Sequence, residues 1–536
     1  GVELPFNTDQ WDGYPRESEE CYKTISHTES NLILAGNSQT YWFITLSAEK
    51  KQILQKHKEG EEWLGGPFVS ILTTQSYIEY LKGNLHIDQD KFDSENNSYK
   101  VFPNKVIENL TVPLLNAEVR FNKNMSFEQI KEFRGFSQRL GVDNKVTLVL
   151  GAGNVSSIPY LETLFHLVAN RSTILLKLNP VNDYLLPIFE KVFAEFIDKG
   201  FISVVNGNLD TSKYLTKHRS VDTIHLTGSN FTYENIVYEK TLTDKERGLS
   251  TLRKVNKKPI FSELGNVTPI IIHPGKWSIS EIKFQARKIA TAKLNNSGFN
   301  CIAAQVIVLP KGWESTDKLK KYIKYYLNKI GDTTSYYPGA SDSLSKLQTS
   351  NNYEQVNEDS CLTPFMVADL DSDDIYATTE VWNSTLYFKE LDYSDYSSYV
   401  ENSINYVNNE LWGNLGVSVL FKGNYKSQHK DFIEKYKNEL NYGTVAINEW
   451  SAIAFIIPTM PWGGFPGNKD NDIQSGKGYV HNALLCDAQL KGIDETKFRY
   501  ARLIDSPWYV NFTIAHKLFK NLANSPANNS NIKFIK

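Results

Sequence analysis

One cysteine stands where a nucleophile could act. Cys301 follows a loop of small and polar residues, "NNSGFN" at 295–300, and precedes the apolar run "IAAQVIVLP" at 302–310. A deprotonated thiol is a strong nucleophile, whereas most lone cysteines are buried and behave as small apolar groups. The residue type alone therefore leaves two interpretations of Cys301, a reactive thiol or a core side chain.

A single carboxylate interrupts another apolar segment. Glu263 stands in "FSELGNVTPIII", directly before a glycine turn. If this segment is buried, the carboxylate must be paired or its pKa must rise through desolvation, and either state suits a general base. An exposed sheet edge would accommodate the same glutamate without any function.

Three strand ends carry groups suited to phosphate contacts. "VLGAGNVSS" at 149–157 places a glycine turn with Asn154 between a strand and a helix, although the third glycine of the dinucleotide fingerprint is missing. Lys177 ends an apolar strand, and Gly228 and Ser229 close another in "LTGS". A plain turn or a solvated lysine is the alternative in each case.

Alternating strands and helices must position these groups. Apolar runs at 145–150, 172–178, 201–207 and 221–229 predict strands, and periodic segments at 158–170 and 183–200 predict helices. This alternation is typical of a parallel sheet covered on both faces. The segment is therefore Rossmann-like.

A second alternating stretch follows Pro259, with a helix predicted over 279–294. We predict an α/β fold: a Rossmann-like parallel-sheet cofactor domain plus a second α/β catalytic domain. The predicted units are an N-terminal region with the cofactor domain over 1–262, a catalytic thiol domain over 263–460, and a return to the cofactor domain with a C-terminal extension over 461–536, which could mediate oligomerisation.

Composition narrows the function classes. The 536 residues are 41% hydrophobic and 22% charged, and 58 basic against 61 acidic side chains give a net charge of -3, which offers nucleic acid no general attraction. No apolar stretch approaches the roughly 20 residues that span a bilayer. The four cysteines lack pairing or metal-ligand spacing, so we predict a reducing, cytoplasmic location and no metal.

The ordered motifs resemble a known family. "LLKLNP" with Lys177, "LTGS" with Ser229, "SELG" with Glu263 and "NNSGFNC" with Cys301 look like successive signatures of the aldehyde dehydrogenase superfamily. "TEVWNS" (379–384), "GTVAIN" (443–448) and "PWGGFPG…SGKG" (461–478) extend the match. The sequence resembles a divergent branch, because "ELGN" and "EVWNS" depart from the usual family segments.

The resemblance implies roles for residues that the chain itself leaves ambiguous. Cys301 would be the nucleophile, Glu263 the base that activates the deacylating water, and Asn154 a donor to the oxyanion. A nicotinamide dinucleotide would be held by Lys177, Gly228, Ser229, Glu380 and Trp382. NAD and NADP both remain possible, because the usual acidic residue near the strand lysine is absent from "LNP" at 178–180.

We therefore predict NAD(P)-dependent oxidation of a small-molecule aldehyde to a carboxylate by a homo-oligomer, a dimer or a tetramer. The alternatives are an acyl-CoA or acyl-phosphate reductase that uses the same cysteine, or a non-catalytic nucleotide-binding protein. Glu263 favours water as the acyl acceptor. Trp412, Trp450 and Trp462 could line an apolar substrate tunnel, although buried tryptophans more often belong to the core.

Overall fold

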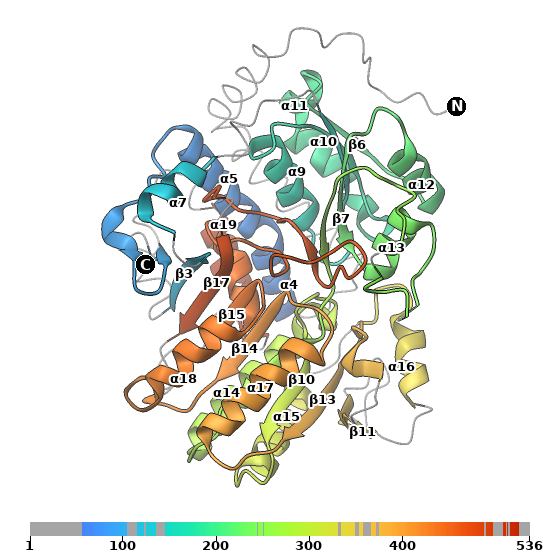
Figure 1. The fold of residues 1–536 in the computed structure, drawn as a ribbon. Helices are drawn as coiled ribbons and strands as arrows, with labels where there is room; N and C mark the ends of the chain where they lie inside the picture. The colour runs from blue at the N-terminus through green and yellow to red at the C-terminus, as the bar shows by residue number, and fades with distance from the viewer. Residues whose placement is uncertain are drawn as a thin grey trace.

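The computed structural model places two β-sheets side by side, each with helices against it (Figure 1). It describes residues 56–103, 115–122, 125–135, 145–243, 245–249, 251–330, 334–348, 353–356, 366–370, 375–486, 489–496, 508–510, 512 and 515–524. Within these residues, no helix is both long and apolar enough to cross a membrane. The predicted α/β class is confirmed.

The smaller sheet has six strands. They are β4 (Val146–Leu150), β5 (Thr173–Lys177), β6 (Ile202–Val205), β7 (Thr223–Gly228), β8 (Ile260–Leu264) and β16 (Gly476–Lys477). Their order is β16-β8-β7-β4-β5-β6, with all strands parallel except β16. The chain passes from β4 to β5 on one side and returns to β7 on the other, which creates the switch point where such sheets bind ligands.

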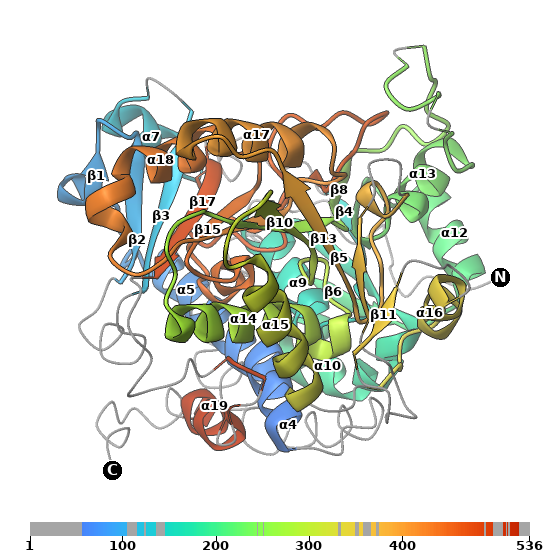
Figure 2. The same ribbon diagram turned by 90° about the horizontal axis from the view of Figure 1, so that it is seen from below.

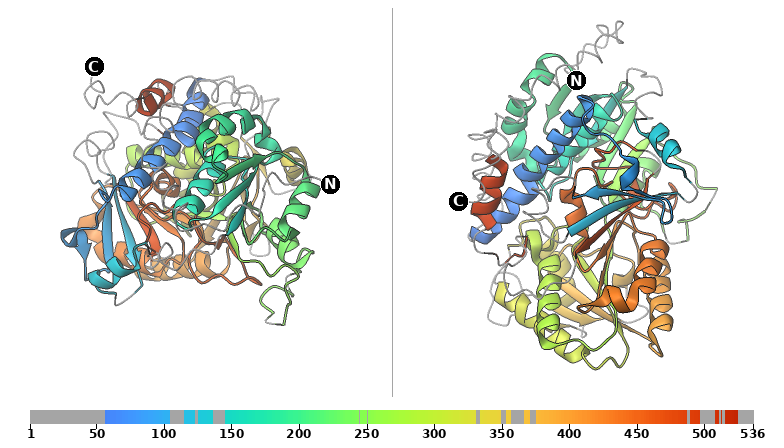
Figure 3. Two further views of the ribbon diagram at one scale, coloured as in Figure 1. Left: turned by 90° about the horizontal axis from the view of Figure 1, so that it is seen from above. Right: turned by 90° about the vertical axis from the view of Figure 1, so that its left-hand side faces the viewer.

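Helices flank this sheet (Figure 3). They include α9 (Ile158–Val168), α12 (Leu209–Lys217) and α13 (Asn230–Tyr238). The sequence of α9 is apolar on almost all of its faces, and every residue of the helix is buried. The polar members of α9 are consequently enclosed in the core of the domain.

The helix predicted over 183–200 is interrupted. The segment forms η4 (Pro180–Leu185), α10 (Leu186–Val192) and α11 (Ala194–Asp198). Pro187 has no N–H to donate, so it belongs in the first turn of a helix and α10 begins beside it. At Phe193 the backbone leaves helical geometry (φ -96°, ψ 11°), and its buried ring stacks on Tyr160 at 5.2 Å.

The larger sheet has eleven strands. In spatial order they are β1 (Phe92–Asp93), β2 (Ser98–Phe102), β3 (Leu115–Phe121), β17 (Gln489–Thr496), β15 (Thr444–Ile447), β14 (Gly416–Leu420), β9 (Thr268–Ile272), β10 (Ala304–Pro310), β13 (Thr385–Leu391), β12 (Met366–Asp369) and β11 (Glu354–Gln355). From β17 to β12 the strands are parallel.

Helices cover both faces of the larger sheet. Figure 2 shows its strands between α17 (Tyr396–Asn409) and α18 (Tyr425–Glu439) on one side and α14 (Ile279–Leu294) and α15 (Thr316–Ile330) on the other. The helix predicted over 279–294 has these same bounds in the structure. A capping box between Ser278 and Glu281 fixes where it starts.

Both ends of the described chain contribute to the larger sheet. β3, from the N-terminal part, pairs antiparallel with β17, from the C-terminal part. The helices α4 (Lys56–Trp63), α5 (Val69–Leu81) and α19 (Ala515–Asn524) lie together at one side (Figure 3). Sheet membership thus groups β1 to β3 with the catalytic strands, whereas the division at residues 262 and 460 stays a prediction.

Candidate active site

The predicted site residues come from facing edges of the two sheets. Glu263 lies near the carboxyl end of β8, at the same edge as the carboxyl ends of β5 and β7. Cys301 lies just ahead of the amino end of β10, which pairs in parallel with β13. The carboxyl edge of the smaller sheet therefore meets the amino edge of the larger sheet at the thiol.

Cys301 and Glu263 are in direct contact. The Cys301 Sγ donates to Glu263 Oε1 at 3.0 Å, although the two residues belong to different sheets. Burial raises the pKa of Glu263, which is 1% exposed, to about 7; the hydrogen bonds from Cys301 and Trp462 oppose this, and the charge of Glu162 adds to it. Burial and the charge of Glu263 raise the pKa of the Cys301 thiol well above its usual value. The pair therefore rests as a thiol facing a carboxyl group that titrates near neutrality.

The thiol follows a tight left-handed loop. After α14, residues Asn296 and Ser297 have φ values of 50° and 59°, and Gly298 has a φ of 85°. A Cβ on Gly298 would stand 2.9 Å from the Asn383 carbonyl oxygen, so only glycine fits there. Asparagine tolerates this region of φ better than most residues. The sequence "NNSG" thus dictates how the chain approaches Cys301.

Asn154 lies in contact with the same loop. Its Nδ2 donates to the Phe299 carbonyl oxygen at 3.0 Å, and the Asn296 amide donates back to the Asn154 carbonyl oxygen at 3.0 Å. The predicted oxyanion donor is therefore near the nucleophile in space. To serve an oxyanion, its amide has to exchange the Phe299 carbonyl for the substrate oxygen.

Glu380 rests on the turn that follows β8. Its Oε1 accepts from the Asn266 backbone N–H at 3.2 Å, and its carboxylate fills the space where Gly265 lacks a side chain. Burial raises the pKa of Glu380 to about 8; the Asn266 N–H lowers it, the charge of Glu263 raises it, and the Lys293 ammonium lowers it. Glu380 is therefore electrostatically coupled to Glu263 and Cys301.

Aromatic rings surround Trp382. It stacks on Tyr337 with ring centroids 5.0 Å apart and lies 6.1 Å from Phe299 in the nucleophile loop. The Tyr336 hydroxyl donates to Asn296 Oδ1 at 2.9 Å. Nothing in "SYYPG" at 335–339 indicated this contribution, because the tyrosines reach the loop only through the tertiary fold.

The remaining predicted cofactor residues end strands of the smaller sheet. Lys177 is 4% exposed, and burial lowers its pKa. Gly228 is exposed directly before α13, and Ser229 caps that helix by accepting from the Thr232 N–H at 3.2 Å. An exposed glycine before a helix N-terminus, near a strand-end lysine, fits the phosphates of a dinucleotide.

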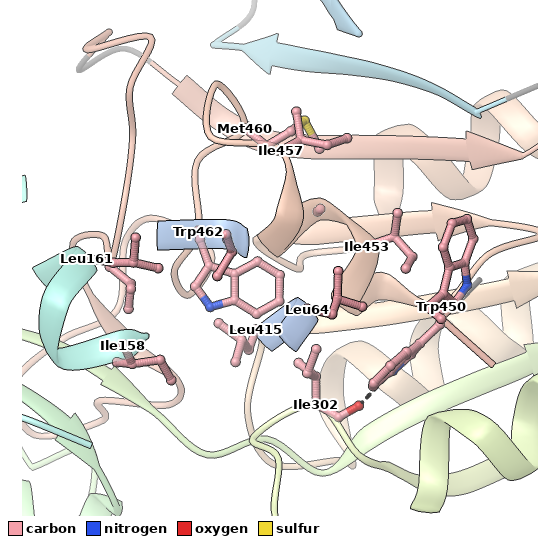
Figure 4. Close-up of a cluster of buried hydrophobic side chains, with 14 of the residues drawn as sticks. Leu64, Ile158, Leu161, Ile302, Leu415, Trp450, Ile453, Ile457, Met460 and Trp462 are labelled. Carbon is pink, nitrogen blue, oxygen red and sulfur yellow. Dashed lines mark hydrogen bonds between the residues drawn. The ribbon is translucent and has the colours of Figure 1, made fainter. Parts of the chain in front are cut away.

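Two of the three tryptophans considered for a substrate tunnel are core residues. Trp450 and Trp462 are 5% and 2% exposed and belong to the apolar cluster of Figure 4, and Trp412 packs at the edge of a different cluster. The Trp450 Nε1 donates to the Ile302 carbonyl oxygen at 3.1 Å. Trp450 thereby anchors the residue after Cys301.

Asn266 bonds to a predicted site residue, Glu380, and the charge of Glu162 acts on another, Glu263; sequence reasoning identified neither. Asn266 is buried, orients Glu380 through its N–H, and donates to the Gly416 carbonyl oxygen at 2.9 Å. "ELGN" offered a signal, since a polar residue replaces a glycine there. Glu162 in α9 carried a weaker one, a lone carboxylate within an apolar helix.

The two parallel-rich sheets with helices against them define a protein of the α/β class. The family model described as "Aldehyde dehydrogenase family" matches residues 154–482. The chain therefore belongs to the aldehyde dehydrogenase family, as its motifs predicted.

Known relatives are distant. Aldehyde dehydrogenase family 3 member A2 from Macaca fascicularis is 25% identical over 197 residues, which is 36% of this chain and 36% of that protein. Staphylococcus aureus AldH in a substrate-bound state superimposes with a TM-score of 0.56 at 15% identity, covering 92% of this chain and 91% of that one. Mycobacterium tuberculosis aldehyde dehydrogenase complexed with NAD+ gives 0.57 at 15% identity, covering 91% and 86%. At 15% identity, these two structural matches show a shared fold and nothing finer.

Proposed function

We propose that the protein oxidises an aldehyde to its carboxylate through a thioester on Cys301, with NAD or NADP as the hydride acceptor. The observation that carries the proposal is the 3.0 Å contact between the Cys301 Sγ and Glu263 Oε1. A nucleophile and a base from separate sheets have no reason to meet in a merely structural core.

In the first step, Cys301 bonds to the aldehyde carbon while its proton passes to Glu263. The carbonyl π electrons move onto oxygen, and this oxyanion accepts from the Cys301 backbone N–H and the Asn154 amide. Losing one such donor typically costs about 2.7–4 kcal/mol of transition-state stabilisation. No histidine stands near Cys301 in the sequence, and Glu263 is the group beside the thiol that can take its proton.

A bound nicotinamide dinucleotide would supply the hydride acceptor, and loss of hydride from the former aldehyde carbon would leave a thioester on Cys301. Glu263, having released its first proton, then withdraws a proton from water as that water attacks the thioester. The carbon–sulfur bond breaks, the sulfur takes this proton back from Glu263 so that the thiol is restored, and the carboxylic acid leaves. Glu263 thus has to be deprotonated twice in each turnover.

We assign the cofactor-binding role to the residues that fit it. Lys177, Gly228 and Ser229 lie at the carboxyl edge of the smaller sheet, where their positions suit the adenosine half and the phosphates. Glu380 lies on the turn that follows β8 and Trp382 lies beside Phe299, and both positions suit the nicotinamide half.

A coupled assay tests the proposal. Purified protein is given NAD or NADP with a panel of aldehydes, with and without CoA, and reduced cofactor is followed by absorbance. We expect turnover without CoA, and loss of at least about a thousandfold in Cys301→Ala with cofactor binding retained. Turnover that requires CoA would instead indicate an acyl-CoA reductase working in reverse. Cofactor binding without any turnover would indicate a nucleotide-binding protein.

The homo-oligomer, the cytoplasmic location and the domain division at residues 262 and 460 stay predictions of the sequence. Size-exclusion chromatography with light scattering measures the first of these directly.

A further inference from the structure

One carbonyl oxygen beside the nucleophile accepts from two side-chain amides. This oxygen belongs to Phe299, two residues before Cys301, and the Asn154 Nδ2 donates to it at 3.0 Å. The Asn296 Nδ2 donates to the same oxygen at 3.1 Å. A carbonyl oxygen has two lone pairs, so both hydrogen bonds are made together. Phe299 is 2% exposed, so these amides, rather than bulk water, satisfy its carbonyl group.

The side chain of Asn296 makes three hydrogen bonds in all. Besides its bond to Phe299, its Nδ2 donates to the Asn154 carbonyl oxygen at 3.0 Å. Its Oδ1 accepts from the Tyr336 hydroxyl at 2.9 Å, and the same hydroxyl lies 3.3 Å from the Asn154 carbonyl oxygen. Because Oδ1 can only accept, the Tyr336 hydroxyl fixes which end of the amide points at the two carbonyl oxygens.

The backbone of Asn296 is held by a further element. Its N–H donates to Glu61 Oε2 at 2.7 Å, and Glu61 belongs to α4, which is part of neither sheet. The φ of 50° lies in the left-handed region, which asparagine tolerates. Contacts from Glu61, Asn154 and Tyr336 thus converge on one residue of the nucleophile loop. These partners are far apart in the sequence, so the tertiary fold places the Asn296 amide.

The proposed oxyanion step gives the second amide a purpose. To donate to the substrate oxygen, the Asn154 amide has to leave the Phe299 carbonyl oxygen. A buried acceptor that loses all its partners costs the desolvation free energy of that group. While Asn296 stays bonded, the Phe299 oxygen keeps a donor throughout the exchange. The exchange therefore costs less than it would with Asn154 as the single donor.

Resting on the proposed function, we propose that Asn296 is a positioning residue of the oxyanion step. It keeps the Phe299 carbonyl group bonded while the Asn154 amide turns to the substrate oxygen. Tyr336 acts one step further from the substrate, because its hydroxyl orients the Asn296 amide. Neither residue touches the reacting atoms, and both act through Asn154.

The first test substitutes Asn296→Gly. Glycine adopts a φ of 50° without strain and keeps the backbone N–H that bonds to Glu61, so the change removes only the side-chain amide. Asn97→Gly is the matched control. Asn97 also has a positive φ, 51°, and its Nδ2 donates to a backbone carbonyl oxygen, that of Asn122. It lies between β1 and β2, at the outer edge of the larger sheet.

The hydride burst with the best aldehyde of the panel reports acylation. For Asn296→Gly we expect a burst about tenfold slower, because the Phe299 carbonyl group then holds the Asn154 amide more tightly. The aldehyde concentration that gives a half-maximal burst, and the cofactor Kd measured by thermal shift, should stay within about twofold of the parent values. A general loosening of the site would change these binding constants as well. Asn97→Gly should leave the burst unchanged.

A double-mutant cycle with Asn154→Ala separates positioning from a merely structural role. Asn154→Ala alone should slow the burst by about 100- to 1000-fold, as losing an oxyanion donor does. Because Asn296 acts through the Asn154 amide, Asn296→Gly should add less than about a twofold loss in that background. An equal loss in both backgrounds would overturn the inference, and so would a parental burst in a folded Asn296→Gly protein.

Tyr336→Phe decides the question if Asn296→Gly does not fold. It removes only the hydroxyl that orients the Asn296 amide, so we expect a burst about fivefold slower. Tyr442→Phe is the control, since the buried Tyr442 hydroxyl donates to the Val407 carbonyl oxygen at 2.8 Å. The control should lower the melting temperature and leave the burst unchanged. A parental burst in Tyr336→Phe would then refute the inference.

The outcome in the parent protein distinguishes the two levels of the argument. A parental burst combined with additive losses in the cycle refutes the role of Asn296 and leaves the proposed function standing. Absence of any burst in the parent protein refutes the proposed function, and the inference falls with it.

Discussion

The reactivity of Cys301 depends on one neighbouring carboxyl group. Burial and the charge of Glu263 both disfavour the thiolate, so the thiol stays protonated while the site is at rest. A carboxyl with a pKa of about 7 can take the thiol proton once the aldehyde carbon is in place. This arrangement protects the half-buried thiol from premature oxidation, since the thiolate is the reactive species.

Glu263→Gln should change stability with a defined pH dependence. Raising the pKa from 4.5 to about 7 means that the folded state favours the protonated carboxyl, so stability is complete below pH 4.5 and is lost as the pH rises to about 7. That loss is at most about 3 kcal/mol. Urea unfolding should show the variant and the parent equally stable at pH 4.5, and the variant more stable at pH 8.

Kinetics on the same variant separate this effect from catalysis. Glu263→Gln should slow the hydride burst, because no carboxylate takes the thiol proton, and should slow hydrolysis even more, so that the acyl-enzyme that does form accumulates as added mass on the intact protein. A variant that is less stable than the parent at pH 8 would contradict the raised pKa. A burst as fast as that of the parent protein would mean that the thiol proton does not pass to Glu263.

At the scale of elements, the loop between α14 and β10 decides where the thiol points. Three consecutive residues with positive φ turn the chain, and Asn154 and Tyr336 bond to that turn. Gly298 is needed for two independent reasons, its φ of 85° and the nearby Asn383 carbonyl oxygen. Local sequence thus sets the loop conformation, and the neighbouring elements hold it.

Gly298→Ala should damage both stability and activity. The left-handed φ alone costs about 1 kcal/mol, and displacement of the Asn383 backbone adds to it, so we expect a total loss above about 2 kcal/mol. The rate of acylation should fall at least about tenfold, because the thiol is displaced. Chemical unfolding and the hydride burst measure the two effects.

Gly312→Ala is the control for this substitution. Gly312 has a φ of 73°, and nothing lies within 4 Å of its added Cβ, so only the conformational cost remains. An equal loss of stability in the two variants, with the burst unchanged in both, would contradict the crowding at Gly298.

At the scale of the whole molecule, the site exists only where the two sheets meet. The thiol and Glu380 come with the larger sheet, and Glu263, Lys177 and Gly228 come with the smaller one. Several contacts join the two edges, among them Asn154 to Phe299 and Asn266 to Glu380. A ligand that binds at this junction should therefore stabilise the whole fold.

NAD or NADP should raise the melting temperature, since a ligand at 100 times its Kd stabilises the folded state by about 2.7 kcal/mol. Lys177→Met keeps the buried aliphatic stem and removes the cation, so the protein should fold while the shift shrinks. Tenfold weaker binding corresponds to about 1.4 kcal/mol. Lys199→Met, at an exposed lysine of the same domain, should keep the full shift. If the cofactor raises the melting temperature of Lys177→Met as much as that of the parent protein, Lys177 does not bind the cofactor.

Much of the fold could be predicted from the chain alone. The strands β4, β5, β7 and β10 are continuous apolar runs, and α14 is bounded by a capping box and by "NNSG", so their patterns are local and legible. The break at Phe193 and the pairing of β3 with β17 could not be predicted from local sequence patterns. The first satisfies a buried aromatic contact, and the second joins segments from opposite ends of the chain.

The same distinction holds for the site. The sequence by itself determined which residues carry chemistry, because a thiol, a carboxylate and glycine turns at strand ends are properties of residue type and order. Only the tertiary structure decided that Glu263 contacts Cys301, that Asn154 lies against Phe299 and that the charge of Glu162 acts on Glu263. Distances between strands of separate sheets, and the burial that raises a carboxyl pKa, arise from packing that no local pattern encodes.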